Sequence, residues 1–375
     1  MTSALPPPTG PFAVGRTVRE WTDRSRTDPY APDPAEPRSL VIWIWYPAQP
    51  SSGPPAGYLP GAWQAAAEML GILAAGLTAH SVDGAPLAAG QAGYPVVLLS
   101  PSGFPPLLLS GIAEELASQG FVVAGINHTY ETAVTVFPDG RTVPVNPAAI
   151  AGALGPQTGT HPAVFQQRAD VCRFKAADLA FVADRLAELD ADDMFAGRLD
   201  LSRLTAVGHS FGGAAALHWC REDPRCIAAV NLDGAVWTEV GREGVPRPVL
   251  QVLAQHAEFE LEPDDAVAAG MAPDAEWYAA EKAITLDGWT TVDRAGKPAH
   301  TVAISGASHL SFMDVPFLPV GSDSLVVPML ARTTIEPGRM LSVTTALVVA
   351  FLSGADMAAV LGSEEIGRVT TAFPP

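Results

Sequence analysis

Residues 204–213 (Leu-Thr-Ala-Val-Gly-His-Ser-Phe-Gly-Gly) constrain the fold of this chain more than any other segment. An apolar run ends at Gly-His-Ser-Phe-Gly, and an alanine-rich stretch at 213–219 follows it. The run is typical of a buried parallel strand, and the stretch is typical of a helix packed closely on a sheet. The Gly-x-Ser-x-Gly spacing predicts a sharp strand-to-helix turn that leaves Ser210 exposed. Gly208 and Gly212 lack a Cβ, so neighbouring backbone can approach this turn closely.

Ser210 is therefore the candidate nucleophile of a hydrolytic site. The alternative is a glycine-rich turn in which the serine only caps the helix that follows.

Short apolar runs alternate with helical patterns along most of the chain. Strands are expected at 39–46, 94–100, 121–126, 226–232, 248–253 and 300–305. Helices are expected at 107–119, 162–189 and 339–352. A strand, a helix and a second strand in succession form a right-handed parallel crossover. The pattern predicts an α/β fold, with a doubly wound, mostly parallel sheet.

A chain of 375 residues is long enough for one large domain with insertions. Residues 1–38 are rich in Pro, Arg and Asp, and we expect them to form an extended N-terminal arm. Residues 39–375 are then a single domain. Three segments depart from the alternation and are interpreted as lid-like insertions, with surface loops as the alternative: 54–92, 129–161 and 313–336.

Charge and composition narrow the functional classes. The formal net charge is 22 − 40 = −18, which disfavours nucleic acid and anionic membrane surfaces as partners. The first residues lack the basic and apolar regions of a signal peptide, and no run of about 18 apolar residues is present. We therefore expect a cytoplasmic protein. Three cysteines are too few for a disulfide framework, and reduced thiols are expected rather than a bridge between Cys220 and Cys226.

A serine hydroxyl needs an adjacent base, which a third group must orient. With a turn of this type, an acid and then a histidine follow the serine along the chain. Of the later histidines, His309 lies in a loop just after the strand expected at 300–305, so it is assigned as the base. His300 opens that strand at its far end, and His256 leaves a poorer order of acid and base.

The acid has more than one candidate. Asp233 directly follows the strand expected at 226–232, whereas Glu258 and Glu260 follow the next strand. An aspartate before a glycine is also common in turns, so position alone leaves these alternatives open.

An oxyanion requires two backbone N–H donors held in place before the reaction. The residue after the nucleophile, Phe211, is expected to supply one of them. The loop after the strand at 94–100 is expected to supply the other from Phe104, because Pro105 and Pro106 have no N–H.

Several motifs together resemble the platelet-activating-factor acetylhydrolase family, the plasma-type and type II α/β-hydrolases with their bacterial relatives. The matching motifs are Val-Ile-Trp-Ile-Trp-Tyr-Pro-Ala, Val-Val-Leu-Leu-Ser-Pro-Ser-Gly-Phe, Ala-Gly-Ile-Asn-His-Thr-Tyr, Gly-His-Ser-Phe-Gly-Gly, Asn-Leu-Asp-Gly and Gly-Ala-Ser-His-Leu-Ser-Phe-Met-Asp. They occur in family order between about residues 40 and 315. The resemblance implies an α/β-hydrolase fold with lid insertions.

The resemblance also implies roles for individual residues. It favours Asp233 over the two glutamates as the acid, and it places the oxyanion donors at Phe104 and Phe211. His128 matches a histidine near the family's site and is interpreted as substrate-binding, with a structural histidine as the alternative. Two features depart from the family: Ser102-Gly103 stands where a His-Gly pair is usual, and the 54–92 insertion is rich in small apolar residues.

The hypothesis from sequence is a serine carboxylic ester hydrolase that needs no cofactor and no metal. Its expected substrates are small-molecule esters with a short acyl group or a lipid-like structure, including 1-alkyl-2-acetylglycerophosphocholine, so lipid degradation is its expected role. The alternatives are a lipase- or cutinase-like polyester hydrolase, a thioesterase, or a non-catalytic ligand-binding protein with the same fold.

Overall fold

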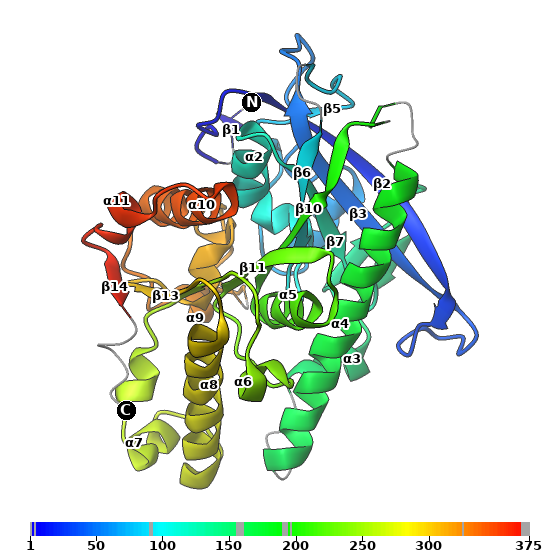
Figure 1. The fold of residues 1–375 in the computed structure, drawn as a ribbon. Helices are drawn as coiled ribbons and strands as arrows, with labels where there is room; N and C mark the ends of the chain where they lie inside the picture. The colour runs from blue at the N-terminus through cyan, green and yellow to red at the C-terminus, as the bar shows by residue number, and fades with distance from the viewer. Residues whose placement is uncertain are drawn as a thin grey trace.

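The computed structural model describes residues 2–3, 5–89, 93–154, 161–189, 194–195, 197–324 and 326–368. Within these residues a ten-stranded sheet forms the centre of the molecule, in the order β14-β13-β12-β11-β10-β6-β7-β3-β2-β5 (Figure 1). In this order the strands span Ile366–Arg368, Ala299–Ile304, Val249–Leu253, Cys226–Leu232, Leu199–His209, Tyr94–Ser100, Val122–Asn127, Pro37–Ala48, Ala13–Thr27 and Val82–Asp83. The strands from β13 to β7 run parallel, while β14 and β3 run antiparallel to their neighbours. The predicted doubly wound, mostly parallel sheet is confirmed.

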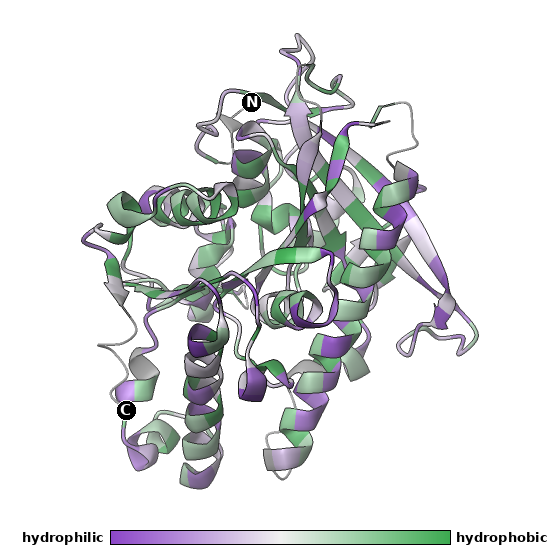
Figure 2. Cartoon of the chain, viewed as in Figure 1, coloured by the Kyte–Doolittle hydropathy of each residue, from purple (hydrophilic) through white to green (hydrophobic). Residues whose placement is uncertain are grey.

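Helices cover both faces of this sheet. Along β3, Val41, Trp43 and Trp45 belong to one core cluster, and Leu40, Ile42 and Ile44 belong to the other, as the period of two in a strand requires. The first cluster packs against α2 (Ser110–Ser118) and α10 (Pro337–Ser353). The second packs against α4 (His161–Leu189), α5 (Phe211–Glu222) and α8 (Ala275–Ala295). In Figure 2 green and purple segments alternate along helices such as α4 and α8, as expected for helices with one buried side.

Shorter elements complete the described part of the chain. They are β1 (Thr2–Ser3), α1 (Ala62–Glu68), β4 (Leu77–Thr78), η1 (Pro106–Leu109), β8 (Val134–Val136), β9 (Thr142–Pro144), α3 (Pro147–Leu154), α6 (Val240–Glu243), η2 (Ala257–Glu260), α7 (Pro263–Ala268), η3 (His309–Phe312), η4 (Val315–Phe317), α9 (Val327–Leu330) and α11 (Ala358–Leu361). No helix among the described residues is both long and apolar enough to cross a membrane. The three cysteines are buried and free.

The N-terminal region differs from the extended arm expected for residues 1–38. Residues 13–27 form β2, which pairs with β3 from Ala13 opposite Ala48 to Thr27 opposite Pro37. Much of β2 is polar, and most of its polar side chains are exposed or half-buried, apart from the buried Arg16 and Asp23. Figure 2 shows the strand mostly white and purple. Because β2 lacks a run of apolar residues, its sequence does not indicate a strand. Residues 13–27 nevertheless belong to the sheet.

Two of the three segments interpreted as insertions pack on each other. Within 54–92 and 313–336, the backbone N–H of Leu73 donates to the carbonyl of Pro319, and Ile72 and Val320 form an isolated bridge. The Tyr58 hydroxyl donates to Asp314 over 2.7 Å, with both side chains buried. These two segments therefore form one continuous structure beside the sheet.

Replacing Trp21, which is buried in β2, tests whether this strand is part of the core. Trp21→Ala should lower the free energy of unfolding by about 3 kcal/mol, because a large buried ring is lost. The matched control Met69→Ala, at a side chain that is 80% exposed, should change it by less than about 0.5 kcal/mol. Urea denaturation measures both values, and equal small changes would show that residues 13–27 behave as an arm.

Candidate active site

The candidate catalytic side chains lie just beyond the carboxyl ends of adjacent parallel strands. Ser210 follows β10, Asp233 follows β11, His256 follows β12, and His309 begins η3 after β13. Open α/β sheets bind ligands at this edge, so the sheet order itself gathers residues that are far apart in the sequence.

Ser210 occupies a strained backbone position. It has φ 58° and ψ −126°, a left-handed conformation between β10 and α5 that serine rarely adopts. A Cβ at Gly212 would lie 1.9 Å from the carbonyl oxygen of Ser100, and one at Gly208 would lie 2.1 Å from that of Gly212. Both glycines are therefore required by close backbone contact, as the sequence predicts. The serine N–H donates to the carbonyl of Leu232 over 2.9 Å, which ties the turn to β11.

A continuous chain of hydrogen bonds connects the serine to the acid. Ser210 Oγ lies 2.9 Å from His309 Nε2, and His309 Nδ1 lies 2.7 Å from Asp233 Oδ2. An ionised carboxylate only accepts hydrogen bonds, so Nδ1 donates to Asp233 and Nε2 is left to accept from the serine hydroxyl. The structure thus brings together the three residues that the sequence selected as nucleophile, acid and base.

The Asp233 side chain is fixed from several directions. Its backbone is also left-handed, with φ 58°, and the Asn231 side chain bridges both backbone groups of Gly234. Oδ1 accepts from the Ala254 N–H and from His256 Nε2, each over 2.8 Å. Burial favours a raised pKa, but His256 and His309 outweigh it and hold the pKa of Asp233 well below its usual range. The acid is therefore an ionised carboxylate near neutral pH.

The other candidates for the acid and the base are not part of the hydrogen-bond chain that joins Ser210, His309 and Asp233. Glu260 is exposed, and the Glu258 side chain lies outside the described part of the chain. His300 is at the opposite end of β13, where its ring packs against Phe351. His256 contacts the Asp233 carboxylate directly, but Ser210 hydrogen-bonds to His309, so His256 does not replace His309 as the candidate base.

His209 is a residue that sequence reasoning missed. It is 1% exposed, and its ring lies 4.6 Å from that of His309, measured between centroids. Burial, together with the nearby His309, lowers the pKa of His209 to about 3. The neutral ring donates from Nε2 to the carbonyl of His309 over 2.8 Å and so anchors the loop that carries this histidine. Its only signal in the sequence is its place directly before Ser210.

The two expected oxyanion donors lie at either side of the turn. Phe211 begins α5, where the first N–H groups of a helix have no partner within the helix. Phe104 lies in the loop after β6, which starts beside the turn because Ser100 contacts Gly212. No acceptor among the described residues takes a hydrogen bond from either backbone N–H. Both groups are thus available to a ligand.

A cavity of about 520 Å³ lies next to this region. The Phe211 ring stacks on Trp237 with 4.8 Å between centroids, and Trp237 forms part of the cavity wall. Apolar side chains from α4 and α8 complete much of the lining, including Phe165, Ala280 and Ile284.

His128 has the contacts of a structural histidine, which was the alternative to the substrate-binding role expected from the sequence. It is completely buried, and both ring nitrogens have protein partners: Nε2 lies 2.9 Å from Ser100 Oγ and Nδ1 lies 2.8 Å from Asp178 Oδ2. Burial and the nearby Lys175 cation lower the pKa of His128 to about 4. The neutral ring donates to Asp178 and accepts from Ser100, so it has no group free for a substrate.

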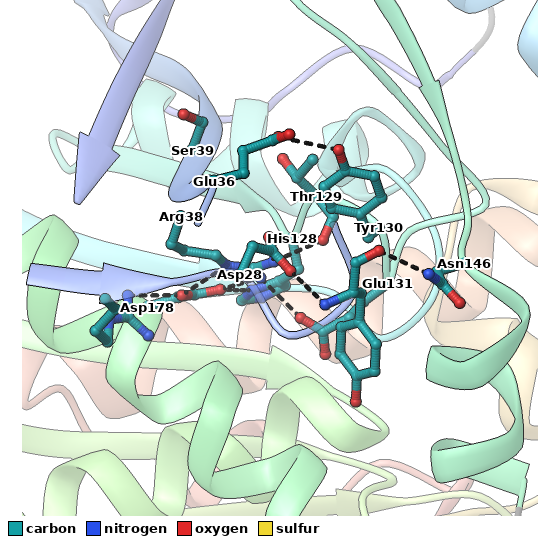
Figure 3. Close-up of polar contacts among 12 residues, drawn as sticks. Asp28, Glu36, Arg38, Ser39, His128, Thr129, Tyr130, Glu131, Asn146 and Asp178 are labelled. Atoms are coloured by element: carbon teal, nitrogen blue, oxygen red, sulfur yellow. Dashed lines mark hydrogen bonds and ion pairs between the residues drawn. The ribbon is translucent and has the colours of Figure 1, made fainter. Parts of the chain in front are cut away.

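His128 belongs to a buried ionic network, which we define as Asp28, Arg38, His128, Glu131, Lys175 and Asp178. Figure 3 shows the Arg38 side chain among these carboxylates. Its guanidinium lies 2.6 Å from Asp178, 2.7 Å from Glu131 and 2.7 Å from Asp28. His128, Glu131 and Asp178 each bring a potential metal ligand within 4.8 Å of the others. Because Arg38 and Lys175 already neutralise these carboxylates, the cluster does not fit a metal ion.

The sheet and the serine turn define the class of this protein, which has the α/β-hydrolase fold. A solved structure, the ferulic acid esterase from Streptomyces cinnamoneus, superimposes with a TM-score of 0.76 at 27% identity. The match covers 98% of this chain and 99% of that one.

Sequence comparison finds a similar family and similar relatives. The model of the family described as "Platelet-activating factor acetylhydrolase, isoform II" matches residues 186–359. A probable 1-alkyl-2-acetylglycerophosphocholine esterase of Arthroderma benhamiae is 30% identical over 66% of this chain, and the platelet-activating factor acetylhydrolase of Cavia porcellus is 25% identical over 68%. The matched regions span 64% and 61% of those relatives. The chain is thus similar, over about two thirds of its length, to proteins of the platelet-activating-factor acetylhydrolase family.

Because His128 is buried and neutral, we predict that the free energy of unfolding falls at acidic pH. Between pH 6.5 and about 4 the unfolded chain is protonated at this histidine and the folded chain is not, so stability falls as pH falls. The difference between the pKa of His128 in the unfolded chain and in the folded chain corresponds to roughly 3 kcal/mol of unfolding free energy. Urea denaturation at pH 7 and pH 4.5 should show a smaller decline for His128→Gln than for the unmodified protein.

Tyr46→Phe is the control for this comparison. It removes a buried hydrogen bond to the carbonyl of Ala85, but burial raises the pKa of Tyr46 to about 12. The variant should therefore decline with pH as the unmodified protein does. Parallel declines for all three proteins would contradict the account of His128.

Proposed function

We propose that this protein is a serine carboxylic ester hydrolase in which Ser210, His309 and Asp233 form the catalytic triad. The hydrogen-bond chain of 2.9 and 2.7 Å from Ser210 through His309 to Asp233 carries the proposal. A base in contact with the hydroxyl and an acid in contact with the base are what a serine nucleophile requires.

Acylation follows from these contacts. Ser210 Oγ attacks the carbonyl carbon of the ester while His309 Nε2 takes the hydroxyl proton. The negative charge on Asp233 stabilises the imidazolium that forms and keeps its Nδ1–H directed away from the serine. Collapse of the tetrahedral intermediate breaks the bond to the leaving oxygen, which receives the proton from Nε2.

Deacylation repeats the steps of acylation with water as the nucleophile. His309 takes a proton from water as it adds to the acyl-enzyme, and the same proton then returns to Ser210 as the acid product leaves. Water and ester are thus the only reactants consumed.

The backbone N–H groups of Phe104 and Phe211 are proposed to bind the oxyanion in both steps. Their lack of acceptors among the described residues supports this role. A donor of this kind contributes about 3 kcal/mol to lowering the barrier.

We propose short-acyl or lipid-like esters as substrates, with 1-alkyl-2-acetylglycerophosphocholine among them. The names of the relatives from Arthroderma benhamiae and Cavia porcellus support this class, and so does the apolar lining of the cavity beside Trp237. We also propose that segments 54–92, 129–161 and 313–336 cover the site. The cytoplasmic location stays a prediction.

Fluorophosphonate labelling tests the proposed nucleophile. The reagent should modify the protein once, at Ser210, by forming an Oγ–phosphorus bond with loss of fluoride. Ser210→Ala should abolish labelling and lower ester turnover by at least about 10³-fold. Ser202→Ala, at an exposed serine on β10, is the matched control and should behave like the unmodified protein. Full turnover by Ser210→Ala would refute the proposal, and a folded protein that resists the reagent would favour a ligand-binding role.

A series of p-nitrophenyl esters tests the substrate class. We expect kcat/KM for the acetate to exceed that for the palmitate by at least about tenfold, because a site that fits a short acyl group has no room for a long one. A maximum at long chains would instead identify a lipase-like enzyme with the same triad.

A further inference from the structure

The loop that carries Phe104 is supported by buried charges rather than by strand pairing. It spans residues 101–104, directly after the carboxyl end of β6. Behind it lies the ionic network defined above, whose central residues Arg38, His128 and Asp178 are completely buried.

Two side chains of the network reach this part of the backbone. His128 Nε2 accepts from the hydroxyl of Ser100, the last residue of β6, over 2.9 Å. Lys175, which is 2% exposed, donates from Nζ to the carbonyl of Ser102 over 3.3 Å. The network therefore contacts Ser100, directly before the loop, and Ser102 within it.

The network also holds the segment that fixes the next peptide. The carbonyl of Gly103 accepts from the N–H of Ala133 over 2.9 Å. Glu131, two residues earlier, is held by Arg38 at 2.7 Å and by Lys175 at 3.1 Å. The carbonyl of Ser102 thus points to Lys175 of the network, and the carbonyl of Gly103 points to Ala133, two residues after Glu131 of the network.

The direction of a carbonyl group determines the direction of the N–H group in the same peptide. In a trans peptide the C=O and the following N–H point in opposite directions. The carbonyl of Gly103 points to Ala133, so the N–H of Phe104 points away from it. The orientation of this donor consequently depends on the contacts behind the loop.

The charges of the network compensate one another. Although burial favours a lower pKa for Arg38 and a higher pKa for Asp178, their mutual attraction outweighs it, and both stay charged. A buried ion that loses its partner is strongly destabilised, so each member has one favoured position. Such a network supports the loop rigidly.

We infer that Lys175 and His128 are positioning residues that orient the Phe104 N–H toward the oxyanion of the reaction. The inference rests on the proposed function, because it concerns a donor that acts only in ester cleavage. Neither residue touches the substrate. The contrasting hypothesis is that the network stabilises the fold and leaves the reaction unaffected.

Two variants test the inference through different atoms of the loop. Lys175→Met removes the donor to Ser102, and Ser100→Ala removes only the hydroxyl that contacts His128. We expect each to lower kcat for p-nitrophenyl acetate by about 10- to 100-fold, because a misdirected oxyanion donor loses most of its effect. KM should stay within about twofold, since the carbonyl of the bound ester carries little charge before attack.

A trifluoromethyl ketone separates positioning from stability. Ser210 adds to its carbonyl carbon and His309 takes the hydroxyl proton, which leaves an oxyanion in the site. Its affinity should fall by the same factor as kcat/KM in both variants. Arg26→Met is the matched control, because Arg26 contacts Asp178 over 2.9 Å and no atom of the loop. It should lower the melting temperature while kcat and inhibitor affinity stay unchanged.

The outcomes are distinct. If Ser100→Ala and Lys175→Met lower the melting temperature but keep kcat within about threefold, the network is only structural and the inference is overturned. An equal loss of kcat in Arg26→Met overturns it as well. If Lys175→Met does not fold, Ser100→Ala decides. Absence of ester turnover in the unmodified protein contradicts the proposed function itself, whereas turnover unaffected by the variants contradicts the inference alone.

Discussion

The left-handed backbone at Ser210 is the constraint on which the rest of the site depends. It is maintained by close contact among three neighbouring segments, since Gly208 approaches Gly212 and Gly212 approaches Ser100. The turn thereby fixes the hydroxyl at the edge of the sheet and brings the loop after β6 next to the start of α5. A side chain at either glycine would separate these segments, so the position of the serine and the approach of the loop after β6 to α5 depend on one packing arrangement.

Two buried electrostatic systems complete the site from opposite sides of the serine. On one side, Asp233 accepts from His256, His309 and the Ala254 N–H, which keeps the carboxylate ionised and oriented. On the other side, Arg38, Asp178 and their partners support the loop that carries Phe104. Both systems place charge where water is excluded, which is where fixed charges and dipoles act most strongly.

Much of this arrangement can be predicted from the sequence. The apolar run before Ser210, the position of His309 after β13 and the 29-residue helix α4 follow from periodicity and spacing. Asp233 needed the family resemblance, because an Asp-Gly pair after a strand is equally typical of a turn. The polar strand β2 and the long helix α8 were missed, since β2 lacks the apolar pattern of a buried strand and α8 has only a narrow buried side.

The ionic network illustrates what spacing alone does not reveal. Arg38 and Asp178 are 140 residues apart, and each is an ordinary charged residue in its local sequence. Only the packing of β3 against α4 shows that they are buried together, and only then does His128 become a member of a network rather than a pocket residue. Local patterns identify residues whose role depends on a turn, whereas buried charge pairs depend on the completed fold.

Trapping the acyl-enzyme tests the central claim most directly. The protein is mixed with p-nitrophenyl acetate, quenched in acid within the first turnover, digested with trypsin and analysed by tandem mass spectrometry. The account predicts an acetyl group on Ser210 in the peptide that spans residues 204–221. Ester cleavage with that peptide unmodified, or an acetyl group on another side chain that forms as fast as nitrophenol is released, would contradict it.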